Sequence, residues 1–140
     1  MITCTKIYND IPFAHRQPNH DGHCAFIHGH NWSISLTFAA HELDNNGFVV
    51  DFGKLKYIKN WIEANLDHAC LLNFTDPCVP DFQNSKYFKL FLISDCSCEG
   101  LAQYLFKTLN SLVNQREGGR VKIIQVIVTE DSKNSTTYSE

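Results

Sequence analysis

Three histidines near the N-terminus have the spacing of ligands to one metal ion. His28 and His30 flank Gly29 in a stretch that reads as an extended strand, and His15 lies in the strand before it. Alternate side chains of a strand share a face, so His28 and His30 point the same way with about 6.6 Å of rise between them. If the two strands pair, His15 completes three neutral imidazoles, which Zn²⁺ accepts with a fourth position open for water or substrate. The spacing therefore predicts a catalytic zinc site.

The alternative is that these histidines are exposed or satisfied inside a core. Five of the chain's seven histidines lie between residues 13 and 30, which favours a shared ligand. His20 and His23 belong to this group, but they fall in a loop rich in Asn, Asp and Gly that gives a side chain no fixed direction. We therefore leave both out of the predicted ligand set.

Cys24 lies four residues before His28 and has two interpretations. As a fourth ligand it would close the site and make the zinc structural. As a free thiol beside zinc or an imidazolium, it would form a thiolate readily and act as a proton acceptor or nucleophile near neutral pH. The residues alone leave both alternatives open.

Further acid and base positions fall at the ends of expected elements. Asp67 and His68 follow a helical pattern, where they either orient and polarise a third group or cap the helix C-terminus. Glu130 follows an apolar row in a strand expected at residues 121–129. Because burying a carboxylate without a partner is costly, this strand end is either solvated or faces something cationic or rich in N–H groups.

The elements that must position these residues follow from periodicity. Alternation predicts strands over residues 28–39, 121–129 and 136–140, and over 2–8 with a continuation to 13–15 across an irregularity at Pro12. Apolar residues at helical spacing predict helices over 51–66 and 97–114. The order ββααββ predicts an α+β fold, with a four-stranded antiparallel sheet and two helices on its apolar face. Joining neighbouring subunits into a closed barrel would remove the exposed sheet edges.

Residues 74–94, between the two expected helices, contain no strong pattern and include Pro77 and Pro80. A connection of this length inside a compact domain is either functional or partly structured. We expect at most an extra turn or a short strand within residues 87–92.

Composition places the chain among globular proteins with one domain, residues 1–140. Its length suffices for one sizeable core, and its charged fraction of 19% is ordinary. A net charge of −3 without a basic run argues against nucleic acid or an anionic membrane as a partner. Because the first residues lack a signal-peptide pattern and no apolar run reaches membrane-spanning length, we expect a cytoplasmic protein. Its six cysteines should then be reduced, with Cys96 and Cys98 as packing residues.

Taken in order, these motifs resemble one family, the pterin synthases of the tunnelling fold. The matching residues are Phe13-Ala14-His15, Cys24-x-x-x-His28-Gly29-His30, Leu66-Asp67-His68, Ser97-x-Glu99, and Glu130 with Tyr138 eight residues later. The family contains the 6-pyruvoyltetrahydropterin synthases and their bacterial relatives, the 6-carboxytetrahydropterin synthases. The resemblance spans nearly the whole chain, and Cys-x-x-x-His-Gly-His is its most specific part.

The resemblance implies a role for each of these residues. It implies a zinc site built from three imidazoles, those of His15, His28 and His30. Cys24 would be the catalytic thiol, assisted by Asp67 and His68 from a neighbouring subunit of a homohexamer made of two trimers. Glu130 would anchor the pterin, whose amino group and ring N–H offer a carboxylate two parallel donors.

The substrate that the resemblance implies is 7,8-dihydroneopterin triphosphate. Zinc would bind its side-chain hydroxyls and make neighbouring protons easier to remove, and Cys24 with the Asp–His pair would move them. The carboxy branch then cleaves the side chain and releases acetaldehyde and triphosphate on the route to queuosine, whereas the pyruvoyl branch loses only triphosphate. The gap of four residues between Cys24 and His28 is similar to that of the bacterial carboxy enzymes and favours that branch.

Departures from the family pattern fall at the rim of the expected pocket. Cys96-Ser97 stands where Pro-Thr is usual, and Asp131 stands where a Thr follows the anchoring Glu, adding negative charge near the pterin. Two other functions remain as alternatives. One is a non-catalytic zinc-binding module with Cys24 as the fourth ligand, and the other is an enzyme of the same fold with different pterin chemistry, such as an aldolase or hydrolase.

Overall fold

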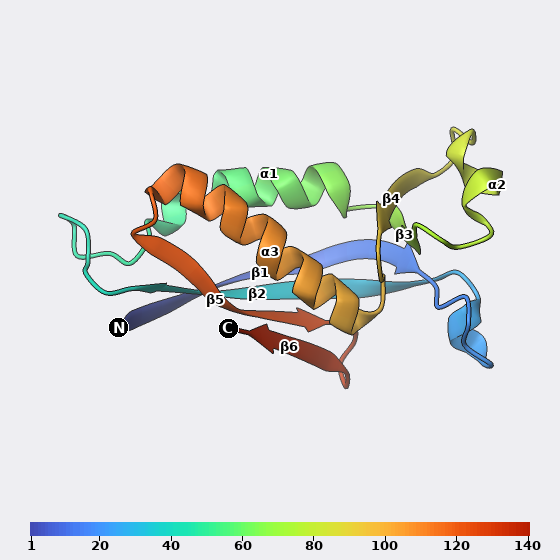
Figure 1. The fold of residues 1–140 in the computed structure, drawn as a ribbon, viewed down its shortest axis with the longest axis horizontal. Coiled ribbons are helices and arrows are strands. Elements are labelled where there is room, and N and C mark those ends of the chain that lie inside the picture. Colours follow the sequence, from blue (N-terminus) through green and yellow to red (C-terminus); the bar gives the residue numbers. More distant parts are fainter.

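A mixed six-stranded sheet forms the centre of this structure, a computed structural model that describes residues 1–140. The strands are β1 (Ile2–His15), β2 (His28–Ala40), β3 (Ala69–Asn73), β4 (Lys89–Ile93), β5 (Val121–Thr129) and β6 (Ser135–Ser139), in the spatial order β4-β3-β1-β2-β5-β6. The helices are α1 (Lys56–Asn65), α2 (Val79–Gln83) and α3 (Cys98–Glu117), with 3₁₀ turns η1 (His23–Ala25) and η2 (Phe52–Lys54). Figure 1 shows α1 and α3 on one face of the sheet.

Four strands form the antiparallel part of the sheet that the alternation predicts, namely β1, β2, β5 and β6. The inward residues of β2 have no exposed surface; they are Trp32, Ile34, Leu36 and Phe38. Burying each such side chain stabilises the fold by about 1.5–3 kcal/mol. The α+β class, the apolar face of β2 and the two helices that cover this face are therefore confirmed.

A bulge in β1 decides which way His15 points. The pairing of β1 with β2 shifts register between Tyr8 and Ile11, and Asp10 within the shift has a positive φ of 57°. Before the bulge even-numbered residues such as Tyr8 pack toward the core, and after it the odd-numbered Ile11 and His15 are buried. Without the extra residue, His15 would lie on the opposite, polar face. The sequence placed this irregularity at Pro12, two residues too late.

The two covering helices depart slightly from their predicted bounds. Ser97 caps α3 by accepting a hydrogen bond from the backbone N–H of Gly100 at 3.0 Å, and Gly118, with φ of 61°, ends the helix. The predicted helix 51–66 begins instead with η2, because the Asp51 carboxylate accepts from the Gly53 N–H and tightens the first turn. The α-helical part then runs from Lys56.

The expectation of only four strands in the order ββααββ is wrong. Residues 69–73 and 89–93 add a parallel pair, with β3 joined to the end of β1 and β4 joined to β3. Their sequences, ACLLN and KLFLI, are short apolar runs without alternation, which is typical of buried parallel strands and hard to recognise by periodicity. The stretch 74–94 is thus partly structured: it contains α2, and the short strand expected within 87–92 is β4.

All six cysteines are free. Cys96 and Cys98 are buried in the main core, as the sequence predicts for packing residues. Burial raises the pKa of both thiols, that of Cys96 to about 11, so neither ionises near neutral pH. These two thiols therefore act in packing and not in chemistry.

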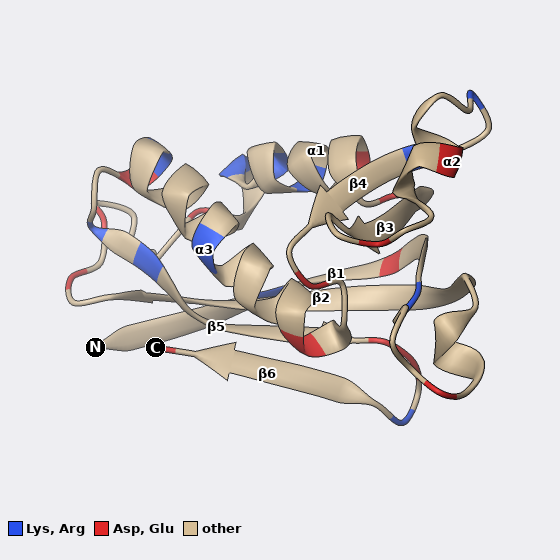
Figure 2. Ribbon diagram, turned by 45° about the vertical axis from the view of Figure 1, so that its right-hand side comes forward, with Lys and Arg blue, Asp and Glu red and all other residues tan.

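The surface carries no strong concentration of basic charge in the view of Figure 2. Lys and Arg are spread there over α1, α3, β5 and the turn after β5. Of the helices, none combines the length and the apolar character that crossing a membrane requires.

Candidate metal centre and active-site cavity

The end of the β1–β2 pair brings the three predicted imidazoles together. His15 and His28 are direct partners across the two strands, and His30 lies two residues further along β2 on the same face. The ring centroids lie 4.6 Å apart for His15 and His28, 5.0 Å for His28 and His30, and 5.4 Å for His15 and His30. The end of β5 and the start of α3 reach the same end of the sheet (Figure 1).

Trp32 forms the floor beneath this cluster. Its ring meets His15 and His30 edge-on, with centroids 4.9 Å and 5.3 Å away. The indole also stacks on Phe13 at 4.4 Å, and its Nε1–H donates to the Phe13 carbonyl at 3.0 Å. Because this indole is fully buried, it excludes water from below the imidazoles and limits their movement.

Backbone carbonyls fix the direction of two of the imidazoles. Nδ1 of His15 lies 2.8 Å from the Cys96 carbonyl oxygen, and Nδ1 of His28 lies 2.7 Å from that of Phe26. A carbonyl oxygen only accepts, so each Nδ1 carries the proton and each Nε2 keeps its lone pair. Each ring therefore presents an unprotonated nitrogen for binding a metal.

The electrostatics of His15 suit a ligand. Burial lowers the pKa of His15 to about 4, against the raising effect of its hydrogen bond to Cys96, and the neighbouring His28 and His30 lower it further. The imidazole is therefore neutral at pH 7, which is the form that binds a metal. Nε2 of His15 and Nε2 of His30 are both buried without a hydrogen-bond partner, and a cation between them would satisfy both.

Glu130, the residue after β5, adds a carboxylate to the cluster. Its Oε1 lies 2.9 Å from Nε2 of His30 and 3.8 Å from Nε2 of His15, without the alignment of a hydrogen bond. One donor atom from each of four residues lies within 4.8 Å of the others: His15, His28, His30 and Glu130. Three imidazoles and a carboxylate are a donor set that fits a divalent cation such as Zn²⁺. The carboxylate at this strand end thus faces the histidine cluster, and a cation held there would be the partner expected for it.

A cavity of about 380 Å³ opens over the cluster. His15, His28 and Glu130 contribute to its wall, and Cys24, from η1, contributes to it as well. The Cys24 sulfur is not among the donor atoms that converge in the cluster. The closed site of three histidines and a cysteine is therefore not formed, and the thiol lies free beside the cluster.

Several residues of the cavity wall were not predicted as site residues. Gln17 follows β1, and its side-chain Nε2 is buried without a hydrogen-bond partner. Glu99, in the first turn of α3, and Lys133, in the turn between β5 and β6, also line the cavity. Gln17 and Lys133 lie in segments that read only as turns, so no periodicity indicates their direction. Glu99 belongs to a matching motif, but its spacing alone indicates only a helix start.

Asp131 lies outside the cavity wall. Its carboxylate accepts hydrogen bonds from the backbone N–H groups of Lys133 and Asn134, both at 2.8 Å, and from the Asn134 side chain. These hydrogen bonds lower the pKa of Asp131 and close the turn after β5. Its negative charge thus serves this turn.

Asp67 and His68 lie apart from Cys24 within the chain. His68 has a positive φ of 63°, and its backbone N–H donates to the Pro12 carbonyl at 2.7 Å. Its Nδ1 lies 2.7 Å from Oδ1 of Asp67, while the imidazole is 80% exposed. His68 lines a shallow surface depression with Gly29 and His30, whereas the cavity that Cys24 lines includes neither Asp67 nor His68. A single chain therefore does not assemble all the predicted catalytic residues.

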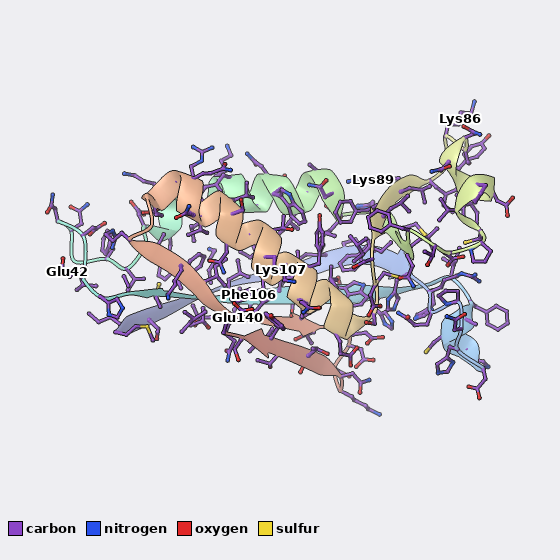
Figure 3. The ribbon with its side chains drawn as sticks, viewed as in Figure 1. Glu42, Lys86, Lys89, Phe106, Lys107 and Glu140 are labelled. Carbon is purple, nitrogen blue, oxygen red and sulfur yellow. The ribbon has the colours of Figure 1, made fainter.

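Lys89 fixes the end of α1 that carries this pair. Its ammonium donates to the carbonyls of Glu63 at 2.8 Å and Asp67 at 2.7 Å, between α1 and β4 (Figure 3). A cation at this position also balances the partial negative charge of a helix C-terminus. Lys89 thus binds the carbonyls at the helix end and fixes the position of the backbone that carries Asp67 and the exposed His68.

The chain is similar to curated proteins along part of its length. A protein of Rickettsia typhi named 6-carboxy-5,6,7,8-tetrahydropterin synthase is 42% identical over 77 residues, which are 54% of this chain and 55% of the relative. The chain thus spans about half the length of the curated relatives that it matches.

Two solved structures share the fold across nearly the whole chain. An uncharacterized protein of Wolinella succinogenes superposes with a TM-score of 0.84 and 21% identity, covering 99% of this chain and 98% of the other. The 6-pyruvoyl tetrahydropterin synthase of Caenorhabditis elegans gives 0.69 and 23%, covering 99% and 95%. At these identities the likeness establishes the fold alone.

The family follows from a match along most of the sequence. Residues 4–140 fit the sequence model of the family described as 6-pyruvoyl tetrahydropterin synthase. The match takes in the three imidazoles, Cys24, the Asp67–His68 pair and Glu130. The chain therefore belongs to the 6-pyruvoyl tetrahydropterin synthase family.

Proposed function

We propose that this protein is a zinc-dependent lyase that converts 7,8-dihydroneopterin triphosphate and water to 6-carboxy-5,6,7,8-tetrahydropterin, acetaldehyde and triphosphate, a step toward queuosine. The observation that carries the proposal is a four-residue donor cluster at a cavity that also presents the free thiol of Cys24. The name of the Rickettsia typhi relative supports the carboxy reaction. We place the reaction in the cytoplasm, where six free cysteines stay reduced.

We assign the zinc to His15, His28 and His30. Zinc, when bound, supplies Lewis-acid polarisation of the substrate's side-chain hydroxyls. The chain's own part is to keep the imidazoles neutral and to fix the directions of His15 and His28 through backbone carbonyls. Three protein ligands are the number that a catalytic zinc site with an open position uses.

Cys24 is the group that we propose moves protons between substrate atoms. Its thiol lies in the cavity wall and outside the donor cluster, so it is free to accept a proton from the carbon beside a substrate hydroxyl. The buried Cys96 and Cys98 cannot take this role because burial raises their thiol pKa values.

Glu130 is the proposed anchor of the pterin. Its side chain is 22% exposed, so one carboxylate both borders the cluster and faces the cavity. Because three imidazoles suffice to hold the metal, the carboxylate remains for the two parallel N–H donors of a pterin ring. The cavity volume of about 380 Å³ is that of a small-molecule site.

We propose that the chain assembles as a homohexamer of two trimers, in which each cavity receives Asp67 and His68 from a neighbour. The sheet has edges for such assembly: β6 is an edge strand, and β1 pairs with β3 only at Ala14 and His15. Pairing these edges between copies would close a barrel and remove both. The exposed His68 is free to enter the cavity of another chain.

An acetaldehyde assay tests the proposed reaction. Purified, zinc-loaded protein is incubated with 7,8-dihydroneopterin triphosphate, and acetaldehyde and triphosphate are quantified beside a chelator-treated control. Equal amounts of both products support the carboxy reaction. Triphosphate without acetaldehyde assigns the pyruvoyl reaction instead, and neither product from zinc-loaded protein refutes the lyase.

A further inference from the structure

Arg16, the residue after the ligand His15, is paired with a carboxylate from a distant part of the sequence. Its Nε donates to Oδ2 of Asp76 at 2.7 Å, and its Nη2 donates to Oδ1 at 2.8 Å. The Asp76 side chain has no exposed surface, and that of Arg16 is 22% exposed. This bidentate, charge-assisted geometry is among the strongest and most directional that side chains form.

The remaining nitrogen of this guanidinium holds the segment that carries Cys24. Nη1 of Arg16 donates to the carbonyl of Ala25 at 3.0 Å. The next residue, Gln17, donates its backbone N–H to the carbonyl of Cys24 at 2.7 Å. Two consecutive residues at the end of β1 therefore grip two consecutive carbonyls of η1.

Little else fixes the segment of residues 17–26, which we call the Cys24 turn. None of the residues of η1 is buried, and no side chain caps this 3₁₀ turn. Phe26, directly after it, is 69% exposed, so the turn is not anchored by apolar packing there. The position of Cys24 thus depends on the hydrogen bonds to the end of β1 before it and on the Phe26 carbonyl, bonded to Nδ1 of His28, after it.

Asp76 is itself rigidly held. Its Oδ1 also accepts from the backbone N–H of Cys78 at 2.9 Å, and its pKa is lowered to about 2, chiefly by the hydrogen bonds from Arg16. The nearby Asn73 accepts from the backbone N–H of Cys96, whose carbonyl orients His15. The segment from Asn73 to Asp76 therefore supports both the metal cluster and the Cys24 turn.

We propose that Arg16 and Asp76 are positioning residues that fix the Cys24 turn at the cavity wall, an inference that rests on the proposed role of Cys24. The carboxylate orients the guanidinium, and the guanidinium holds the Ala25 carbonyl. Neither side chain is required to touch the substrate. Breaking this relay releases the thiol, while the pairing of β1 with β2 and the Cys96 carbonyl beside His15 keep the imidazoles together.

The test uses a double variant, Arg16→Met with Asp76→Asn. Removing both charges together avoids leaving one of them buried and unpaired, and Asn keeps an acceptor for the Cys78 N–H. Arg120→Met is the matched control, because Arg120 likewise donates to two loop carbonyls, those of Glu42 and Val49. A third variant, Arg16→Lys, keeps the positive charge but cannot form the two parallel hydrogen bonds of the guanidinium to Asp76.

Amide hydrogen exchange, which needs no substrate, measures how firmly Arg16 and Asp76 hold the Cys24 turn. In the double variant, exchange within residues 17–26 should be about tenfold faster than in the wild type. The Arg120→Met control should leave this segment unchanged and instead speed exchange after β2. Unchanged exchange within residues 17–26 of a cooperatively folding double variant would overturn the proposal.

Kinetics separate positioning from a merely structural role. The double variant should lose about 100-fold in kcat, with KM and zinc content within about threefold of wild type, since misplacing one reacting group by about 1 Å has such an effect. The kcat of Arg16→Lys should lie between that of the wild type and that of the double variant. Faster exchange with an unchanged kcat would overturn the proposal. A wild type inactive toward the dihydropterin would refute the proposed function, while faster exchange would still support the tether.

Discussion

The metal cluster and the Cys24 turn border one cavity but are built in different ways. The imidazoles stand on paired strands above a buried Trp32, and two of them have carbonyl partners. The thiol stands on a short turn with no buried residue, held by the end of β1. The difference teaches that metal binding and proton transfer should fail separately when the chain is changed.

The largest expected effect on turnover comes from removing a histidine of the metal cluster on β1 and β2. His28→Ala removes one of three neutral donors, so we expect loss of most bound zinc and at least about a 1,000-fold fall in turnover. Metal analysis and the acetaldehyde rate measure both. His41→Ala, an exposed histidine just after β2, is the control and should behave as wild type. A His28→Ala variant with full zinc content would contradict the ligand assignment.

On the turn side, activity and metal content should separate. Cys24→Ala removes the proton-transfer group from outside the donor cluster, so zinc content should stay at the wild-type level while kcat falls about 100- to 1,000-fold. Cys4→Ala, a half-buried cysteine near the start of β1, serves as the control. Loss of zinc from Cys24→Ala would show that the sulfur binds the metal.

A mixing experiment sharpens the comparison by testing where His68 acts. His68→Ala should be as inactive as Cys24→Ala, because each variant lacks one half of every site. Oligomers refolded from an equal mixture should regain about a quarter of wild-type activity, since random assembly pairs an intact Cys24 with a neighbour's intact His68 at that frequency. No recovery would place both residues of a site in one chain.

Acid should weaken the tether of the turn. The Arg16 guanidinium lowers the pKa of Asp76 to about 2 in the folded protein. As the pH falls, the Asp76 carboxylate is therefore protonated in the unfolded chain before it is protonated in the folded one. The stabilisation is therefore complete above about pH 4 and is lost as the pH falls toward about 2. Compared with Arg16→Met/Asp76→Asn, the wild type should lose about 1 kcal/mol of unfolding free energy between pH 6 and pH 3, measured by urea titration. Parallel pH curves for the two proteins would contradict this.

The smallest expected effect lies next to the cavity. Ser97→Ala removes the cap of α3, where the hydroxyl accepts the Gly100 N–H, and should lower the unfolding free energy by about 1 kcal/mol. Thermal unfolding measures the loss. Zinc content should stay unchanged, because the Cys96 carbonyl that orients His15 belongs to the backbone. A fall in zinc content would link the cap to the cluster.

The same contrast explains what the sequence could predict. Alternation along β2 sets directions, so the shared face of His28, His30 and Trp32 could be read before any coordinates. β5 was predicted at its observed bounds for the same reason. β3 and β4 were missed because apolar runs without alternation carry no directional signal.

In the turns, the sequence shows which residues could act but not where their side chains point. The sequence indicates Cys24 but leaves open whether it binds the metal, and only the structure separates its sulfur from the donor cluster. Gln17 lies in a turn, where no periodicity indicates that its amide is buried at the cavity. The Arg16–Asp76 pair spans sixty residues, a separation at which no local pattern reports contact. The proposed intersubunit role of Asp67 and His68 likewise stays a prediction from resemblance.

The bulge at Asp10 restricts how the length of β1 can vary. Ahead of it, residues 2–8 pair with β2 and contribute nothing to the metal cluster, so a change of length there does not alter the direction of His15. Between the bulge and His15 the spacing is fixed, because one added residue would aim the third imidazole into the polar side of the sheet. An engineered one-residue insertion in that interval should yield a protein that folds but holds zinc weakly, which makes residue count, as well as residue type, a requirement of the site.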